Sequence, residues 1–307
     1  MKHIFIVNPV AGKGKYQLEI IKNIENQLYG KTDFEIYITK SKEDVKRYVI
    51  SKCKENVSMV LYACGGDGTL HDVINSAQDY EQVNIGIIPC GTGNDYVKNF
   101  ENYYNFNDVI AQIEGSKVEL DLIKVNDEYA ASVCNIGFDA DAAFNMHKFK
   151  SIPFITGTGC YILSVLYSLT KKLGKNLEVE VDDKIKFNGK FLLGVIANGN
   201  SYGGGYKCAP KAIINDGIID ICFIDKISRF KILGLINEYK IGKHLENENI
   251  KKYVTYKKCK TVRMKCDNPI NLCIDGESSI HNELFFEISH KSLRFWIPKG
   301  TKPIYVV

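Results

Sequence analysis

The sequence has no long uninterrupted hydrophobic run. Its first apolar run covers only residues 4–7, which is shorter than the roughly 7–15 residues of a signal-peptide core. The most apolar longer stretch, residues 160–169, is interrupted by Ser164 and Ser168 and falls below the ~18 residues that a membrane span needs. We therefore expect a protein that stays in the cytoplasm and spans no membrane.

Metal-binding cysteine pairs are also missing. There are 10 cysteines but no CxxC pair, and no histidine cluster accompanies Cys259, Cys266 and Cys273, which recur every seven residues. The usual zinc spacings are therefore absent. In a chain without an export signal we expect the cysteines to be reduced and mostly buried.

The chain has only 7 prolines and no linker rich in proline and glycine, no internal repeat and no heptad run. Its composition, 45% hydrophobic and 25% charged, excludes a disordered, collagenous or low-complexity protein. At 307 residues a single core would be large, so we expect two domains.

Acidic and basic residues are unevenly distributed. The 40 Lys+Arg and 36 Asp+Glu give a net charge of +4. With a cut after Asp121, the first part has 13 Lys+Arg and 17 Asp+Glu, and the second part has 27 Lys+Arg and 19 Asp+Glu. The two parts thus carry −4 and +8 by count. Such an asymmetry predicts that the second part faces an anionic surface.

Strand and helix patterns alternate in the first third of the chain. Short apolar or β-branched runs occur at residues 4–7, 34–39, 57–63 and 84–89, residues 16–28 have helical spacing, and Ser41 opens a second helix with a capping signal. This alternation predicts βαβ units and an α/β domain with a parallel sheet, whose ligands bind at the carboxyl ends of the strands.

After Asp121 the pattern changes to strands in hairpin order, and Asp182-Asp183 and Asn188-Gly189 are turn signals. Helical stretches near residues 159–173 and 228–244 interrupt the strands. We expect a mainly antiparallel β-sandwich here. The predicted domains are residues 1–121 and 122–290, with a C-terminal segment at about 291–307 that packs back on the first.

A glycine cluster, Gly65-Gly66-Asp67-Gly68-Thr69, follows the apolar run 57–63 and opens a helical pattern. Glycines let the backbone approach an anion, and a helix N-terminus offers free N–H groups to phosphate. Because Asp67 would repel phosphate, it suits a Mg²⁺ ion that lies between carboxylate and phosphate. The alternative is a plain turn in which Asp67 caps the helix.

Two further loops follow predicted strands. Gly91-Thr92-Gly93-Asn94-Asp95 should emerge at the same sheet edge, with Thr92 suited to phosphate and Asp95 to a hydrated metal, although a capped turn is the alternative. Residues 8–15 match neither GxxxxGK[ST] nor GxGxxG, yet Lys13 and Lys15 near a helix start suit an anion. Asn215-Asp216-Gly217 and Asp275-Gly276-Glu277, taken alone, read as turns.

Together these motifs resemble the diacylglycerol kinase catalytic-domain family of bacterial lipid kinases, related to sphingosine and ceramide kinases. The resemblance is carried, in order, by NPVAGKGK, GGDGT, GTGND, the A-P-x-A-x-x-x-D-G stretch at residues 209–217, and DGE at residues 275–277. It implies a nucleotide-binding α/β domain, similar to that of NAD kinases and phosphofructokinases, then a β-rich domain, with the active site between them.

The resemblance also implies roles for particular residues. Asp67 and Asp95, with Asp216, would hold the metal and water network around the phosphates, and Glu277 would be the general base. At a structural Mg²⁺ site, Asp216 would supply a carboxylate, and Ile213 and Ile218 backbone carbonyls. The residues implied to contact ATP are Asn8, Pro9, Val10, Ala11, Gly12, Thr39, Gly65, Gly66, Asp67, Gly68, Thr69, Leu70, His71 and Thr92.

The sequence departs from the family's pattern in two places. Ala11 stands where serine is frequent, and His71-Asp72 stand where Asn-Glu is frequent. Backbone contacts to phosphate would survive either change, whereas side-chain contacts from these positions would not.

The expected function is therefore transfer of the γ-phosphoryl group of ATP, with Mg²⁺, to the hydroxyl of a membrane lipid, first of all diacylglycerol. Phosphatidylglycerol or a sphingosine-like alcohol, a soluble kinase of the NAD kinase type, and a catalytically dead regulator remain alternatives. We expect peripheral contact with the anionic inner face of the membrane and no nucleic-acid partner, and a homodimer stays open.

Overall fold

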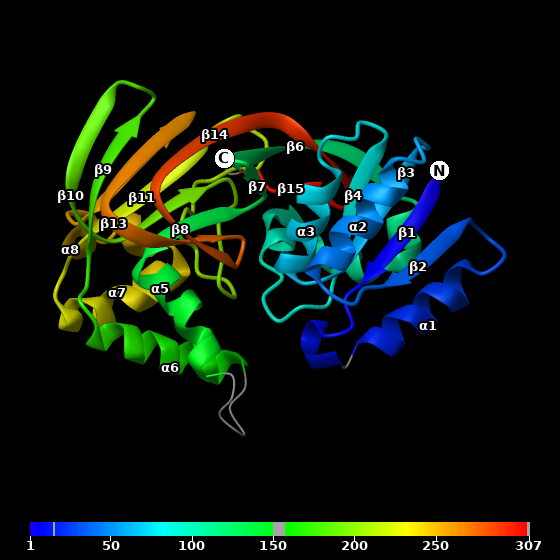
Figure 1. Cartoon of the computed structure of the whole chain (residues 1–307), viewed down its shortest axis with the longest axis horizontal. Coiled ribbons are helices and arrows are strands. Elements are labelled where there is room, and N and C mark those ends of the chain that lie inside the picture. Colours follow the sequence, from blue (N-terminus) through cyan, green and yellow to red (C-terminus); the bar gives the residue numbers. More distant parts are fainter. Residues whose placement is uncertain (15, 150–156, 306–307) are drawn as a thin grey trace. The chain divides into compact units, whose positions relative to one another are not determined.

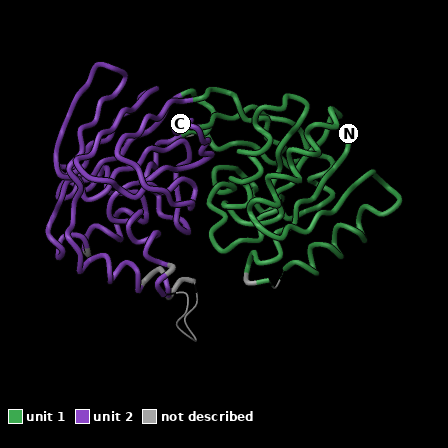
Figure 2. Tube along the Cα trace, viewed as in Figure 1, with its two compact units in different colours: residues 1–122, 213–217, 289–307 green, residues 123–212, 218–288 purple. Residues whose placement is uncertain are grey.

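The structure is a computed structural model that describes residues 1–14, 16–149 and 157–305. It divides into two compact units (Figure 1, Figure 2). Unit 1 comprises Met1–Leu122, Ile213–Gly217 and Ser289–Val307, and unit 2 comprises Ile123–Ala212 and Ile218–Ile288. These limits compare with the expected ones at 121 and 290, but nothing in the sequence indicated that residues 213–217 group with unit 1.

Unit 1 alternates strands and helices along its first ninety residues. Its elements are β1 (Lys2–Val7), η1 (Ala11–Gly14), α1 (Gln17–Leu28), β2 (Phe34–Ile38), α2 (Lys42–Cys53), β3 (Met59–Gly65), α3 (Asp67–Ala77), β4 (Val83–Pro89), η2 (Tyr96–Asn99), β5 (Phe100–Glu101), η3 (Tyr103–Asn107), α4 (Val109–Ile113), most of β6 (Ser116–Val125), the end of β14 (Glu277–Ile297) and β15 (Lys302–Pro303).

The strands of unit 1 pair in the order β14-β4-β3-β1-β2. β1 is parallel to β2 and β3, and β3 is parallel to β4. Every residue of β3 is buried, which explains why this strand reads as a continuous apolar run. The C-terminal segment joins this sheet as anticipated, with Phe295 opposite Ile85, so unit 1 is completed by the end of the chain.

The predicted helix start at Ser41 is confirmed, because its hydroxyl accepts a hydrogen bond from the Asp44 N–H. On α1, Ile24 and Leu28 are buried against Phe5 and Tyr62 of the sheet. The helices thus bury the apolar stripe that their sequence spacing predicted.

Unit 2 is rich in strands. Its elements are the end of β6, β7 (Glu128–Ala130), β8 (Val133–Gly137), α5 (Phe138–Asn145), η4 (Met146–Phe149), α6 (Gly157–Thr170), β9 (Lys175–Val181), β10 (Ile185–Ala197), β11 (Ile219–Asp225), α7 (Arg229–Ile241), η5 (Lys243–Leu245), α8 (Glu248–Lys251), β12 (Val254–Cys259), β13 (Thr261–Ile274) and the start of β14.

The pairings within unit 2 are antiparallel, from β12 through β11, β10, β8 and β13 to β14, with β9 paired to both β10 and β13. β11 is buried on both faces: Ile219, Ile221 and Phe223 enter one hydrophobic core, whereas Cys222 and Ile224 enter a second core that α7 covers. The alternation follows from the two-residue period of a strand.

The expected turn at Asn188-Gly189 is wrong. β10 runs without interruption from Ile185 to Ala197, and Gly189 pairs with Leu177 of β9. The pairing to β9 continues up to Phe191, beyond which β10 pairs with β8 and β11. A long strand shared by several neighbours therefore prevails over the local turn preference. The Asp182-Asp183 turn is confirmed, with φ of 52° and 53°.

The expectation for the cysteines is confirmed. All ten are free thiols, and nine of them are buried. Burial raises the pKa of Cys53 and Cys90 to about 11, so these thiols stay protonated and behave as small apolar side chains.

Unit 2 also buries a carboxyl group, that of Asp139 at the start of α5, which is 6% exposed. It accepts hydrogen bonds from the Tyr202 hydroxyl and the Ala140 N–H. Desolvation by burial outweighs these bonds and raises its pKa from 3.8 to about 6.

Asp139 should therefore destabilise unit 2 progressively as the pH rises through 6. The Asp139 carboxyl binds a proton more tightly in the folded protein than in the unfolded chain. The free energy of unfolding therefore falls by about 3 kcal/mol as the pH rises from about 4 to 6. In urea unfolding, Asp139→Asn should gain this much stability relative to the wild type between pH 4 and 6.5. The exposed Asp183→Asn should show no such trend; equal trends in both variants would contradict the assignment.

Candidate functional site

The loop after β3 and the loop after β4 are joined by the carboxylate of Asp67, the first residue of α3. Its Oδ2 accepts the N–H of Asp95 and its Oδ1 accepts the N–H of Tyr96, each at 3.0 Å. These are charge-assisted bonds and are stronger than bonds between neutral groups. Asp67 therefore sets the position of the second loop.

The same two loops touch through glycine backbones. A Cβ on Gly91 would lie 2.5 Å from the Cα of Gly66, so a side chain would push the loops apart. A Cβ on Gly93 would lie 3.3 Å from Oδ2 of Asp67 and 3.4 Å from Oδ2 of Asp95. The two carboxylates thus lie near the same glycine, as expected for loops that share one sheet edge.

The loop after β1 joins them. Asn8 donates from Nδ2 to Oγ1 of Thr69 at 3.0 Å, and its N–H donates to the carbonyl of Cys64. Gly12 has φ of +56°, and a Cβ there would lie 2.6 Å from the carbonyl oxygen of Cys90. The expected meeting of the loops after β3 and β4 at one sheet edge is confirmed, and the structure adds the loop after β1 to them.

The other residues expected to contact ATP differ in their exposure and hydrogen bonding. Thr39, at the end of β2, donates from Oγ1 to the carbonyl of Val7, and Thr92 is exposed. Leu70 and His71 are 1% and 4% exposed, so a contact from either would come from the backbone. Lys15 lies outside the described residues.

The geometry suits phosphate near the start of α3. Gly66 is the N-cap residue of this helix and makes no side-chain cap bond, and the helix dipole adds partial positive charge where the N–H groups are free. The site can therefore hold phosphate oxygens through backbone donors.

The acidic residues fit a Mg²⁺ ion that keeps water and phosphate ligands. Asp95 is buried and pairs with Nζ of Lys98 at 2.6 Å, and Asp67 lies beside it. Among the described residues no group of three or more His, Cys, Asp or Glu side chains is placed to hold a metal. Mg²⁺ usually takes one or two carboxylates together with substrate phosphates, which matches Asp67 and Asp95.

The structure assigns a role to Asp121, which sequence reasoning missed. This carboxylate is fully buried in unit 1 and accepts the N–H of Gly217 at 2.7 Å, the N–H of Lys291 at 2.7 Å and a bond from His290 Nδ1 at 2.8 Å. It fastens the turn that carries Asp216. A charged residue inside the apolar run 120–123 was the signal available in the sequence.

Asp216 is half-buried in this turn, and Gly217 has φ of +73°. The carbonyl of Ile214 accepts the N–H of Asp121. The roles of Asp216, Ile213 and Ile218 at a structural Mg²⁺ site stay predictions.

Glu277 lies in unit 2 as the first residue of β14, after the turn formed by Asp275 and Gly276. The carboxylate of Asp275 accepts three consecutive backbone N–H groups at 2.6 to 3.0 Å, those of Ala131, Ser132 and Val133. This turn is therefore rigidly held, and it presents the partly exposed Glu277 next to a fixed backbone.

Comparison with known proteins covers both units. The diacylglycerol kinase catalytic domain matches residues 2–125, and the YegS C-terminal NAD kinase beta sandwich-like domain matches residues 132–296. A diacylglycerol kinase of Staphylococcus saprophyticus is 28% identical over 282 residues, 89% of this chain and 87% of that protein. A probable lipid kinase YegS-like of Shewanella frigidimarina is 27% identical over 263 residues, 83% and 81% of the two chains.

A crystal structure of a diacylglycerol kinase from Bacillus anthracis has the same fold, with a TM-score of 0.70 at 19% identity over 97% of each chain. The domain matches span most of the sequence and include the three loops that Asp67 and its neighbours hold together. The chain therefore belongs to the diacylglycerol kinase catalytic-domain family of lipid kinases.

Proposed function

We propose that this member of the lipid kinase family transfers the γ-phosphoryl group of ATP to the hydroxyl of diacylglycerol, giving phosphatidic acid. The observation that carries the proposal is the joining of three glycine-containing loops around Asp67, beside the N-terminus of α3. Phosphoryl transfer demands positioning and charge neutralisation more than covalent chemistry, and these loops supply positioning.

The first task of the chain is to bind the phosphates. Backbone N–H groups of the loops 8–12 and 65–69 would donate to phosphate oxygens, and the Thr92 hydroxyl would add a donor. Mg²⁺, bound near Asp67 and Asp95 together with the phosphates, would neutralise charge on the transferred group. The Asp67 carboxylate is already oriented by two N–H groups, so it needs no rearrangement on binding.

The second task is to activate the acceptor. We assign Glu277 as the general base that takes the proton of the lipid hydroxyl. The oxygen of that hydroxyl forms a bond to the γ-phosphorus at the same time. The bond from that phosphorus to the bridging oxygen breaks, and ADP leaves with the electron pair. Asp275, held by three backbone N–H groups, acts as a positioning residue for Glu277.

Membrane contact is part of the proposal. Among the described residues, no helix is both long and apolar enough to cross a bilayer. The enzyme would therefore reach its substrate from the membrane surface, with the excess positive charge after residue 121 attracted to anionic lipids.

The substrate assignment is tested with radiolabelled ATP, Mg²⁺ and a panel of acceptors: diacylglycerol, phosphatidylglycerol, sphingosine and undecaprenol in mixed micelles, and NAD in solution. We expect the highest kcat/KM with diacylglycerol. Preferred labelling of another lipid alcohol would reassign the acceptor, labelling of NAD alone would replace the proposal, and ATP binding without turnover on any acceptor would indicate a regulator.

Asp67→Asn should lower kcat/KM at least a hundredfold. An amide presents one acceptor instead of two, so one of the N–H groups of Asp95 and Tyr96 loses its partner, at a cost of about 2 kcal/mol in stability, and the charge that suits Mg²⁺ is removed. Phosphate transfer and thermal unfolding are measured together. Asp79→Asn, an exposed site after α3, is the matched control, and full activity of Asp67→Asn would refute the assignment.

Glu277→Gln should lower kcat by roughly 10² to 10⁴, the usual range for a general base, while the KM for ATP stays nearly constant. The loss should shrink as the pH rises, because hydroxide then replaces the missing base. Glu283→Gln, an exposed position of the same strand, should behave like the wild type. An equal pH profile for Glu277→Gln and the wild type would exclude this role.

A further inference from the structure

Unit 2 carries a basic surface that the phosphoryl transfer does not use. We name it the α6–α7 platform and define it by Ser168–Lys175 at the end of α6 and the loop that follows, Lys190 of β10, and Lys226–Phe230 at the start of α7. Two adjoining hollows of about 200 and 450 Å³ lie in it and share Lys172 and Leu173.

The platform is strongly cationic. Lys171, Lys172 and Lys175 line the first hollow, and Lys190, Lys226 and Arg229 line the second. The single carboxylate in their linings, that of Asp141, is already engaged by Lys175 at 2.9 Å and by Asn271 at 2.7 Å. Among the ion pairs between described residues, none involves Lys172, Lys190 or Lys226.

The backbone that carries these basic residues is held in place. Arg229 donates to the carbonyls of Leu169 at 2.7 Å and Lys171 at 3.0 Å, so the start of α7 is fastened to the end of α6. Gly174 has φ of +82°, and a Cβ there would lie 2.9 Å from Cγ of Lys190 and 3.2 Å from Cβ of Lys226. The glycine therefore lets two lysine stems approach the loop.

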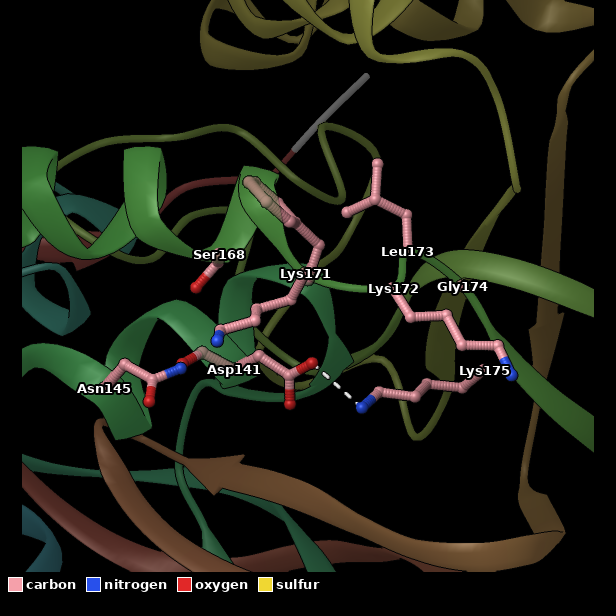
Figure 3. A pocket seen from close by; sticks show the side chains of 9 residues that line it. Asp141, Asn145, Ser168, Lys171, Lys172, Leu173, Gly174 and Lys175 are labelled. Atoms are coloured by element: carbon pink, nitrogen blue, oxygen red, sulfur yellow. Dashed lines mark hydrogen bonds and ion pairs between the residues drawn. The ribbon is translucent and has the colours of Figure 1, made fainter.

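The first hollow has an unfilled donor. Ser168 is 3% exposed, and its hydroxyl has no hydrogen-bond partner among the described residues. In Figure 3 the side chains of Ser168 and Lys171 point toward those of Asn145 and Asp141 in this hollow. A buried polar group without a partner is costly, and an anionic oxygen in the hollow would satisfy it.

Phe230 gives the platform an apolar contact. Its side chain is 88% exposed, the highest value among the large hydrophobic residues of the described chain, and it lies among Ser228, Arg229 and Lys226 at the rim of the second hollow. An exposed aromatic ring flanked by cations is the arrangement that suits the boundary between lipid headgroups and acyl chains.

We propose that the α6–α7 platform is the face by which unit 2 docks on a bilayer containing anionic phospholipid, with lipid phosphates in the two hollows and Phe230 inserted below them. This deepens the proposed function, since it rests on a membrane lipid as substrate. Phe230 is the one aromatic residue of the platform as defined, whereas a single-stranded nucleic acid stacks successive bases on several rings and an acidic peptide requires none, so a lipid surface fits the platform best.

The test is sedimentation of the full chain, without ATP, with vesicles of phosphatidylcholine alone or with one quarter phosphatidylglycerol. The wild type should bind the anionic vesicles preferentially. Lys172→Gln/Lys226→Gln should weaken that binding roughly thirtyfold, about a factor of five for each lysine. Lys184→Gln/Lys260→Gln, which removes two exposed lysines elsewhere in unit 2, is the matched control and should bind like the wild type.

Insertion is tested separately with Phe230→Trp. Its added fluorescence should shift to the blue on anionic vesicles and be quenched by lipids brominated on the acyl chains, over the background of the buried Trp296. Circular dichroism melting confirms that each variant is folded. Equal binding of the platform and control variants, or an unquenched Trp at position 230, would overturn the proposal.

Failure of docking and failure of the kinase function are distinguishable. Phosphorylation of a short-chain diacylglycerol dissolved as monomers should be equal in the wild type and the platform double variant. If the wild type phosphorylates it but both double variants bind vesicles equally, docking alone fails. If no acceptor is phosphorylated while vesicle binding still depends on the platform, the kinase function fails and docking stands. Tighter platform-dependent binding of a single-stranded oligonucleotide than of anionic vesicles would overturn the lipid assignment.

Discussion

The candidate site depends on the fastening of one loop to another by the carboxylate of Asp67. Its two oxygens hold the N–H groups of Asp95 and Tyr96, while Gly66 and Gly91 bring the two backbones into contact. The spacing between the loops is thus set by backbone atoms and one short side chain, which leaves little freedom. A backbone held in this way is preorganised, as electrostatic stabilisation of a transferred phosphoryl group requires.

Aspartate carboxylates also hold backbone N–H groups at other turns. Asp275 holds the three N–H groups of residues 131–133, Asp182 holds those of Lys260 and Thr261, and Asp121 holds those of Gly217 and Lys291. In each case a carboxylate accepts backbone N–H groups that cannot stay unpaired when buried; the donors are consecutive for Asp275 and Asp182, whereas those of Asp121 come from two distant segments. These turns position the residues that follow them, such as Glu277 after Asp275.

The sequence was informative wherever a few neighbouring residues decide the structure. The Ser41 cap, the Asp182-Asp183 turn and the glycine loops after buried strands are all local features, and all are present. The sequence failed where distant partners decide. Asn188-Gly189 reads as a turn, but the pairing of β10 with β9 keeps it extended.

The missed role of Asp121 has the same cause. Its backbone partners lie 96 and 170 positions away along the chain, so no local pattern could reveal them. The hydrogen bonds of Asp67 to residues 28 and 29 positions away were equally hidden, although the motif itself was recognisable. A single sequence therefore identified the acidic residues of the site more readily than what holds them.

The alternatives first considered for Asp67, a structural cap and a metal-associated carboxylate, are compatible. A carboxylate offers about four acceptor positions, so holding two N–H groups leaves room for a hydrated cation. Asp67 and Asp95 both lie near Gly93, and Lys98 pairs with Asp95, so the three side chains together carry one negative charge. That charge attracts a divalent cation but is too small to bind it firmly without further anionic ligands. Metal and nucleotide should therefore bind together at this edge of the sheet, since the phosphates supply the oxygen ligands that the chain lacks.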